Sequence, residues 1–293
     1  MTQPTTKPTI QPTIPAEQQL HSHGEILQLV QLSDLHLPEQ RALGYRGLDV
    51  DRQFQQILAD LEVRFPQLDA LLLSGDLVHH GSESGYRRLL DYLQDFGVPW
   101  YWIPGNHDDA RMMARLSPQQ PKVLSWNGWR LVLLDSSAEP DGRGSGSLPI
   151  SELQLLSQQL QLALEQQQRL LVVLHHNPVS VDSPWQDQIM LGNAEALWRT
   201  LAPADAAGMP VMLLFGHIHQ GRGFAHGIHR LYSCPATSVQ FAAGTEQMQL
   251  VDGGPLAAPG YRWLELRPFD SGEDRRDPVE SWLRSGIVRL DLA

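Results

Sequence analysis

The chain has 293 residues, 42% of them hydrophobic and 19% charged, a composition typical of a globular protein that can bury a core without disulfides. Its formal net charge of −11 argues against general binding to nucleic acid polymers or anionic membranes, although bound metal ions would still let it accept an anionic substrate. It has no apolar stretch of bilayer length, no visible secretory signal and a single cysteine, Cys234, so we expect a cytoplasmic protein.

The chain reads as a tail followed by one domain. Residues 1–24 are rich in Pro, Thr and Gln, and we predict that they form a flexible tail. From residue 25 to residue 293 strand-like and helix-like patterns follow one another without a linker, so a single domain is expected.

Apolar residues spaced three or four apart predict the helices. These cover 50–65, 86–96, a segment that begins at Ser151, and 194–201. Gly97 is expected to cap the second helix at its C-terminus. Ser151 and Gln154 have the spacing of a capping box at the start of the third.

Hydrophobic runs predict the strands. They cover 27–33, 68–74, 100–104, 130–135, 170–176, 211–217, 230–235, 261–267 and 286–292. The first three alternate with helices, as in a parallel sheet, whereas the last three are joined by loops and favour antiparallel or mixed pairing. The fold class is therefore α/β, with two layers of sheet covered by helices as the simplest architecture.

Five short polar motifs follow these runs. They are Asp34-Leu35-His36, Gly75-Asp76, Gly105-Asn106-His107-Asp108, His175-His176 and Gly216-His217-Ile218-His219. The carboxyl ends of the strands in an open α/β sheet form the crevice where ligands bind. Carboxylate, amide and imidazole groups together suit Mn, Fe or Zn. The sequence therefore predicts a metal site at this edge.

Spacing within the motifs predicts how they would act. Asp34 and His36 are two residues apart, so in an extended segment their side chains point the same way, and the same parity holds for His217 and His219. Asp76 is expected at the centre of the site, because a carboxylate can bridge two cations through its two oxygens.

The order of the five motifs resembles the calcineurin-like metallophosphoesterase superfamily. The resemblance implies a four-layer α/β/β/α sandwich with mixed sheets, so that residues 25–293 would form one catalytic domain with a dinuclear site. The ligands it implies for metal one are Asp34, His36, Asp76 and His219. Those it implies for metal two are Asp76, Asn106, His175 and His217.

Longer segments are similar to the bacterial class III cyclic 3′,5′-AMP phosphodiesterases. These segments are 103–108, 170–179, 183–197, 216–220, 234–241 and 260–267. The resemblance implies hydrolysis of cyclic 3′,5′-AMP to 5′-AMP by a metal-bridging hydroxide, whose formation a metal favours by lowering the pKa of water. It also implies two divalent or mixed-valence ions, with Fe and Mn preferred over Zn or Co.

Roles in catalysis and substrate binding follow from the same resemblance. His107 would lie beside the phosphorus without binding metal and would protonate the leaving 3′-oxygen. Asp108 would orient His107 or a ligand, or else cap a helix. The residues expected to contact the substrate are Asn106, His107 and His219 at the phosphoryl group and Trp185, Asn193 and Gln240 at the nucleotide.

Other polar residues near these motifs have ordinary interpretations. We expect His79 and His80 to be solvated loop residues, and Arg143 and Arg222 to be surface arginines. In an extended strand the side chain of His176 points away from that of His175. His176 is then either an ordinary strand residue or one that lines the pocket or supports a ligand.

Several alternatives stay open. The substrate is alternatively a glycerophosphodiester, a 2′,3′-cyclic nucleotide or a nucleotide-lipid, and a metal-free scaffold on the same fold is a third reading. The identity of the metal, the choice between cyclic AMP and cyclic GMP, and the state as monomer or homodimer are not determined by the sequence.

Overall fold

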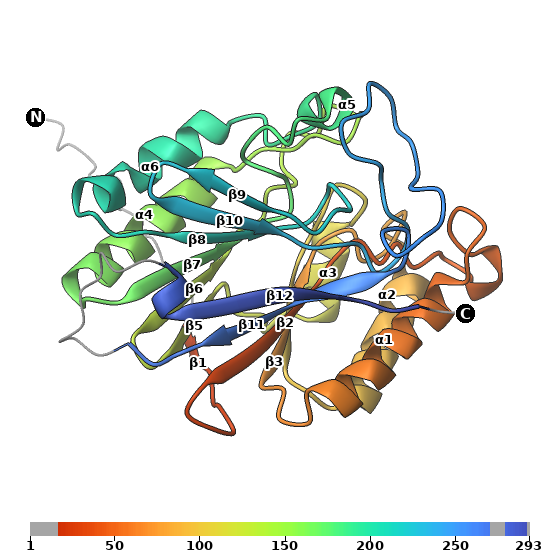
Figure 1. Ribbon diagram of the computed structural model, residues 1–293, viewed down its shortest axis with the longest axis horizontal. Coiled ribbons are helices and arrows are strands. Elements are labelled where there is room, and N and C mark those ends of the chain that lie inside the picture. Colours follow the sequence, from red (N-terminus) through yellow and green to blue (C-terminus); the bar gives the residue numbers. More distant parts are fainter. Residues whose placement is uncertain (1–16, 270–278, 292–293) are drawn as a thin grey trace, which may run out of the picture.

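The computed structural model describes residues 17–269 and 279–291. Two β-sheets lie face to face, and helices cover the outer face of each (Figure 1). The larger sheet contains β1 (Glu17–Gln19), β5 (Val123–Trp126), β6 (Trp129–Leu133), β7 (Arg169–Val173), β8 (Met212–Phe215), β10 (His229–Ser233) and β9 (Gly223–His226), in that order. The smaller contains β12 (Leu283–Arg289), β11 (Gly260–Leu266), β2 (Leu27–Leu32), β3 (Ala70–Ser74) and β4 (Trp100–Ile103).

Both sheets are mixed. In the smaller sheet β2, β3 and β4 are parallel, whereas β11 runs antiparallel to β2 and to β12. In the larger sheet β6, β7, β8 and β10 run parallel, whereas β5 and β9 are antiparallel to their neighbours β6 and β10. The predicted mixed α/β fold is confirmed.

The helices form the two outer layers. They are α1 (Val50–Arg64), α2 (Glu83–Phe96), α3 (Ala110–Leu116), α4 (Ile150–Glu165), α5 (Pro184–Asp187) and α6 (Ala194–Ala206), with short 3-10 helices at Arg41–Leu43 and Val279–Ser281. Helices α1 and α2 lie over the smaller sheet, and α4 and α6 over the larger (Figure 1). No helix in the described ranges combines the length and the apolar character needed to cross a bilayer.

Strand β2 shows why the sheets become inner layers. Leu27 and Leu29 point into the core between the two sheets, and Val30 and Leu32 point into the core beneath α1 and α2. Because both faces are apolar, this strand is stable only when it is covered on both sides. A third core lies between the larger sheet and α4 and α6.

The helix predictions are confirmed for α1 and α2, and Gly97 caps α2 with a left-handed φ of 74°. The capping box predicted at Ser151 is wrong, because α4 already begins at Ile150 after Pro149 and has no side-chain cap. Helix α6 continues through Pro203 to Ala206, past the predicted end at 201, because Leu201 and Ala204 are both buried.

The predicted tail is wrong in its last part. Residues Glu17–Gln19 form β1, which pairs in parallel with β5, and Leu20 is buried with its N–H bonded to the Ser125 carbonyl. The side chains of β1 itself are exposed, so this edge strand has no hydrophobic pattern that the sequence could reveal. Residues 1–16 lie outside the described ranges, and the assignment of 25–293 to one domain stays a prediction.

Candidate metal centre

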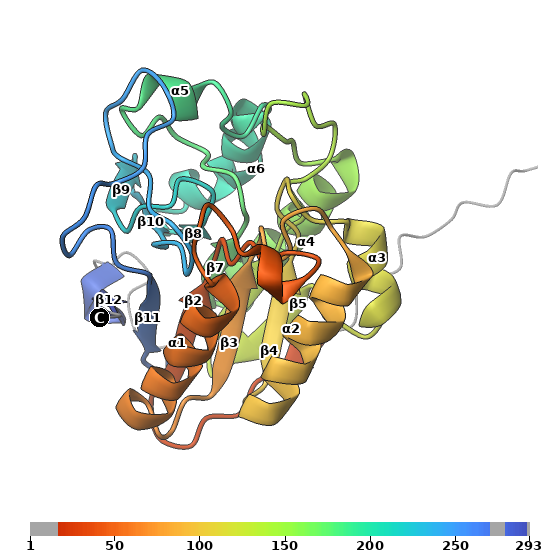
Figure 2. The same ribbon diagram turned by 90° about the vertical axis from the view of Figure 1, so that its right-hand side faces the viewer.

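The loops after the strands meet at one end of the two sheets (Figure 2), and there they bring six candidate ligand side chains into two buried groups of three, beside a third and partly exposed group of His36, His79 and His107. All six are buried, and within each group the candidate ligand atoms lie within 4.8 Å of one another. The first group is Asp34, His36 and His219, and the second is Asp76, His175 and His217. The two groups divide the residues as the two predicted ligand sets do.

The backbone at these motifs is not extended. Asp34, His36, Asp76, His217 and His219 all have positive φ, between 51° and 68°. Residues other than glycine rarely adopt this conformation, and such strain is found at functional sites. The extended backbone predicted for the Asp34–His36 and His217–His219 pairs is therefore wrong. The residue pairs still reach the centre because left-handed turns, rather than strand alternation, direct them there.

Backbone hydrogen bonds hold these turns together. The Asp34 N–H donates to the Gly75 carbonyl at 3.0 Å, and the His36 N–H to the Asp76 carbonyl at 2.9 Å. The His217 N–H donates to the Asp34 carboxylate at 3.1 and 3.2 Å. The first two bonds join the loops after β2 and β3 of the smaller sheet, and the third joins the loop after β8 of the larger sheet to the smaller one.

Asp76 lies between the two groups. Its Oδ2 atom is 3.7 Å from His36 Nε2 and 3.4 Å from His175 Nε2. Its Oδ1 atom accepts the backbone N–H of His107 at 2.8 Å. Although burial raises the pKa of Asp76, the imidazoles of His175 and His36 lower it well below its usual value. One oxygen, rather than the two expected, therefore faces both groups.

Carbonyl oxygens select which imidazole nitrogen is free. His175 Nδ1 donates to the Ser74 carbonyl at 2.8 Å and His219 Nδ1 to the Val239 carbonyl at 2.7 Å, whereas His217 donates from Nε2 to the Ile189 carbonyl at 3.0 Å. A metal-binding histidine usually donates its other N–H in this way. These contacts leave the lone pair of the opposite nitrogen directed toward the ligand group.

The donor set fits two cations. Carboxylate oxygens and imidazole nitrogens are all borderline or hard ligands, and the single thiol, Cys234, is buried elsewhere with its Sγ directed at the Gln31 carbonyl. Burial lowers the pKa of His175, but Asp76 and Asp34 outweigh it and raise that pKa to about 9. A cation would satisfy the same carboxylates and displace this proton. Asn106 Oδ1, 3.3 Å from His175 Nε2, stands beside the second group.

A cavity of about 330 Å³ opens over the two groups. It is lined by His36, Tyr45, Arg46, Asp76, His79, Asn106, His107, Arg143, Gly144, Trp185, Ile189, His217, His219, Phe241 and Met248. His107 faces His36, with ring centroids 4.9 Å apart. The cavity therefore combines candidate metal ligands with polar and aromatic groups from several loops.

His79 corrects an expectation from the sequence. It is half-buried rather than solvated, it stacks on His107 at 4.7 Å, and its Nδ1 lies 3.3 Å from His36 Nδ1. Burial lowers its pKa to about 4. In the sequence, only its position three residues after Asp76 indicates that His79 lies beside the candidate ligands.

Asp108 does not contact the His107 ring. Its carboxylate accepts the N–H groups of Leu77, Val78 and Gly105 and the hydroxyl of Tyr86, at 2.8 to 3.1 Å. The expected role in orienting His107 is wrong, because these donors already occupy both oxygens. Asp108 instead ties the loop after β4 to the loop after β3.

The three predicted nucleotide contacts separate in the structure. Trp185 lines the cavity, with its Nε1 donating to Thr245 Oγ1 at 3.1 Å. Asn193 and Gln240 do not line this cavity, and their contact with the nucleotide stays a prediction. The Asn193 amide makes two hydrogen bonds to the backbone of Leu148, and the buried Gln240 donates to the Ala236 carbonyl.

The remaining candidates surround the centre at different distances. His176 is not in either group; it contacts Ser136 Oγ at 2.8 Å and the Gly144 carbonyl at 3.2 Å, so it supports a loop of the cavity. Arg143 reaches the rim of the cavity, as a surface residue paired with Asp141. Arg222 does not line it and donates to the Val181 carbonyl.

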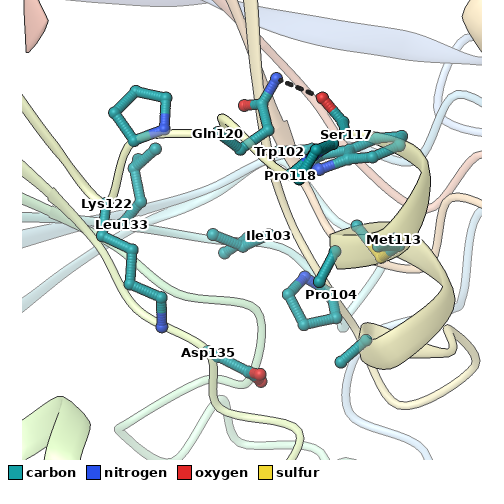
Figure 3. A pocket seen from close by; sticks show the side chains of 13 residues that line it. Trp102, Ile103, Pro104, Met113, Ser117, Pro118, Gln120, Lys122, Leu133 and Asp135 are labelled. Atoms are coloured by element: carbon teal, nitrogen blue, oxygen red, sulfur yellow. Dashed lines mark hydrogen bonds between the residues drawn. The ribbon is translucent and has the colours of Figure 1, made fainter. Parts of the chain in front are cut away.

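A second cavity, of about 300 Å³, lies beside α3 and the ends of β4 and β6 (Figure 3). Its labelled walls include Trp102, Pro104, Met113 and Leu133, with Lys122 and Asp135 on one side (Figure 3). Lys122 is paired with Glu152. None of the grouped histidines lines this cavity.

Comparison with known proteins agrees with this geometry. Residues 27–221, more than half of the chain, match the family described as Calcineurin-like phosphoesterase. The chain is 36% identical over 266 residues to the 3′,5′-cyclic adenosine monophosphate phosphodiesterase CpdA of Pseudomonas aeruginosa, covering 90% of each chain. It is 30% identical to the enzyme of the same name from Escherichia coli K12, covering 82% of this chain and 85% of that one.

Solved structures share the fold. A dimetal phosphatase from Danio rerio superposes with a TM-score of 0.60 at 14% identity, covering 83% of this chain and 96% of that chain. The resemblance predicted from the five motifs is confirmed by the family match and by these relatives. The chain belongs to the calcineurin-like phosphoesterase family.

Proposed function

We propose that this protein hydrolyses cyclic 3′,5′-AMP to 5′-AMP at a dinuclear metal centre. The observation that carries the proposal is the pair of buried ligand groups at the floor of one cavity, with Asp76 of the second group 3.7 Å from His36 of the first. The relatives named as cyclic AMP phosphodiesterases support the substrate, since they match this chain over most of its length.

Each ion would have four ligands in this chain. Asp34, His36, Asp76 and His219 would hold the first; Asp76, Asn106, His175 and His217 would hold the second. Two bound cations supply activation of a water molecule and offset negative charge on the phosphoryl oxygens. Iron and manganese are the ions we propose, with zinc and cobalt as alternatives that the same donors accept.

His107 is the proposed proton donor. It lines the cavity beside His36, its backbone is fixed by the bond to Asp76 Oδ1, and its ring is fixed by stacking on His79. When water adds to phosphorus, the bond between phosphorus and the 3′-oxygen breaks, and a proton from His107 would neutralise that oxygen. The phosphate then remains on the 5′-oxygen of the product. Asn106 and His219 would contact the phosphoryl group at the cavity floor.

The aromatic and apolar part of the cavity lining suits a nucleobase. Trp185 and Phe241 lie edge to face with ring centroids 5.1 Å apart, and Ile189 and Met248 line the same cavity. Aromatic and apolar side chains can stack on a base, which is sequence-tolerant because every base has a π-face. We therefore keep Trp185 as a base contact.

We further propose that the enzyme acts in the cytoplasm, as a monomer or a homodimer, without binding a nucleic acid polymer or a membrane. The buried, unpaired Cys234 supports a reducing compartment. The net charge of −11 supports the absence of polyanionic partners.

Substrate choice is tested by kcat/KM on protein reconstituted separately with Mn and with Fe. The panel holds cyclic 3′,5′-AMP, cyclic 3′,5′-GMP, 2′,3′-cyclic AMP, a glycerophosphodiester and bis(p-nitrophenyl) phosphate. We expect a preference for cyclic 3′,5′-AMP with 5′-AMP as the product. Equal or faster turnover of the other diesters would overturn the substrate and keep the metal chemistry. Failure to bind metal at all would leave the scaffold interpretation.

A further inference from the structure

Arg46 is a cation at the cavity that the ligand motifs do not include. It lines the cavity, and its guanidinium lies 5.4 Å from the centroid of the Tyr45 ring and 5.9 Å from that of Phe241. These two rings in turn stack on candidate ligands of the first group, Tyr45 on His36 at 4.4 Å and Phe241 on His219 at 4.1 Å. Arg46 is therefore aligned with the first ligand group.

The charge of Arg46 has no carboxylate partner within the described ranges. Its one hydrogen bond there runs from Nε to the Tyr45 hydroxyl at 3.1 Å, which leaves the two terminal nitrogens for another acceptor. Two neighbours differ in this respect. Arg41 in the same loop lies 3.7 Å from Asp49, and Arg143, which also lines the cavity, pairs with Asp141 at 3.0 Å.

The loop that carries Arg46 is built tightly. Tyr45 and Leu48 exchange two backbone hydrogen bonds, of 2.9 and 3.0 Å, around Arg46 and Gly47. Both central residues have positive φ, 48° and 83°, as in a type I′ turn, which favours Asn-Gly or Gly-Gly. Arginine is unfavourable at this position, so the turn holds the side chain over the cavity at a cost in backbone conformation.

We propose that Arg46 binds the phosphoryl group of the substrate beside the first ligand group. A guanidinium presents a planar fork of N–H donors that matches two phosphate oxygens. The bond to Tyr45 and the two rings restrict the side chain before substrate arrives, which lowers the entropy cost of binding. The inference rests on the proposed phosphodiester chemistry, but it concerns a group that every phosphodiester contains.

The test uses the full-length, metal-loaded protein and three variants. Arg46→Met removes the charge and keeps the apolar stem, Arg46→Lys keeps the charge without the fork, and Arg41→Met removes a charge from the same loop outside the cavity. Inorganic phosphate and adenosine are the probes, with affinities measured by titration calorimetry and by competition. Metal content and turnover of bis(p-nitrophenyl) phosphate are measured on the same samples.

For Arg46→Met we expect the affinity for inorganic phosphate and kcat/KM for bis(p-nitrophenyl) phosphate to fall roughly 10- to 100-fold, because a charge-assisted hydrogen bond is lost. Adenosine affinity and metal content should not change. Arg46→Lys should recover part of the loss, and Arg41→Met should match the unmodified protein.

Three results would overturn the inference. Unchanged phosphate affinity in Arg46→Met would show that Arg46 does not bind the phosphoryl group. An equal loss for adenosine would assign it to the base instead. Loss of metal would mean that it acts by holding Tyr45 against His36. If the unmodified protein cleaves the aryl diester but not cyclic AMP, the substrate proposal fails while this test still runs.

Discussion

The floor and the rim of the cavity are built in different ways. The floor consists of buried side chains at the ends of sheet strands, and even His217, the most exposed of the six grouped ligands, is only 6% exposed. The rim consists of Arg46, Arg143 and Met248 on exposed loops. Since loops vary more readily than the elements they connect, the rim can change substrate preference while the floor keeps the same chemistry.

Glycine makes the floor compact. A Cβ atom at Gly105 would lie 2.3 Å from Asp76 Oδ1, and one at Gly216 would lie 2.0 Å from Ser33 Oγ. The loops of the two sheets thus approach too closely for any side chain at these positions. The rim has no such constraint at Gly142, where a Cβ would meet nothing within 4 Å.

The largest effect is expected from Asp76→Ala. Loss of the carboxylate between the two groups should remove metal and lower kcat/KM by at least roughly 10³-fold, since each metal supplies several kcal/mol of charge stabilisation. Elemental analysis and steady-state kinetics on the same sample measure both effects. Asp91→Ala, an exposed carboxylate on α2, is the control. Retained metal and turnover would refute the bridging role.

His107→Ala is expected to separate chemistry from metal binding. Turnover should fall by roughly 10² to 10⁴-fold, the contribution typical of a positioned general acid, with metal content near that of the unmodified protein. The backbone bond to Asp76 Oδ1 survives this change. His80→Ala, at an exposed site outside the cavity lining, should be silent. If His107→Ala loses metal, His107 is a ligand and the assigned role is wrong.

Gly105→Ala tests the packing of the floor without removing any ligand. The added methyl group would displace Asp76 or His175, whose Nε2 would lie 2.8 Å from the new Cβ. Metal affinity should weaken by about 10- to 100-fold, as when supporting groups of a metal site are changed. Metal titration of the apo-protein measures this. Gly24→Ala, with nothing within 4 Å, is the matched control, and equal affinities for both variants would contradict the argument.

Trp185→Ala tests the aromatic part of the cavity lining. Loss of one aromatic contact to a base costs about 1–3 kcal/mol, so KM for cyclic AMP should rise about tenfold or more. Turnover of bis(p-nitrophenyl) phosphate, which has no nucleobase, should change little. A parallel loss on both substrates would mean that Trp185 holds the loop through Thr245 and Phe241 rather than binding the base.

Asn193→Ala should have the smallest effect on catalysis. Its amide is occupied by the two hydrogen bonds to Leu148, so the variant should lose about 1–3 kcal/mol of stability and keep kcat/KM near that of the unmodified protein. Denaturant unfolding and cyclic AMP kinetics measure the two quantities. A selective rise in KM for cyclic AMP would identify Asn193 as a nucleotide contact.

Much of the fold could be predicted because its strands are buried on both faces. Apolar runs mark β3, β7 and β8 in the sequence, β2 is an apolar run interrupted by Gln28 and Gln31, and helices α1 and α2 have clear apolar stripes. The strands β1 and β9 were missed because their residues are mostly exposed, whereas the mostly buried β5 was missed because it has only four residues. Helix α3 was missed because, of its seven residues, only Met113 is buried, too few for a periodic pattern.

The sequence by itself determined the floor of the site. Each motif directly follows a buried strand, and the carboxyl ends of parallel strands meet at one edge of a sheet. The kind of donor group and the edge on which it lies could therefore both be predicted from short segments of the sequence. The grouping of Asp34 with His36 depends on left-handed turns at both residues, which their spacing did not predict. The candidate ligand side chains themselves could be named from the motifs without knowledge of distant contacts.

Only the tertiary structure decided which polar groups remain available. The Asn193 amide makes two hydrogen bonds to the backbone of Leu148, 45 residues away. Arg46, in contrast, has no carboxylate partner among the described residues and lies over Phe241 from a distant loop. The free nitrogen of each imidazole is likewise selected by carbonyls from other segments. A hydrogen-bonding group that is already bonded to the backbone has fewer donors and lone pairs left for a substrate, and that competition is settled by contacts between residues far apart in the sequence.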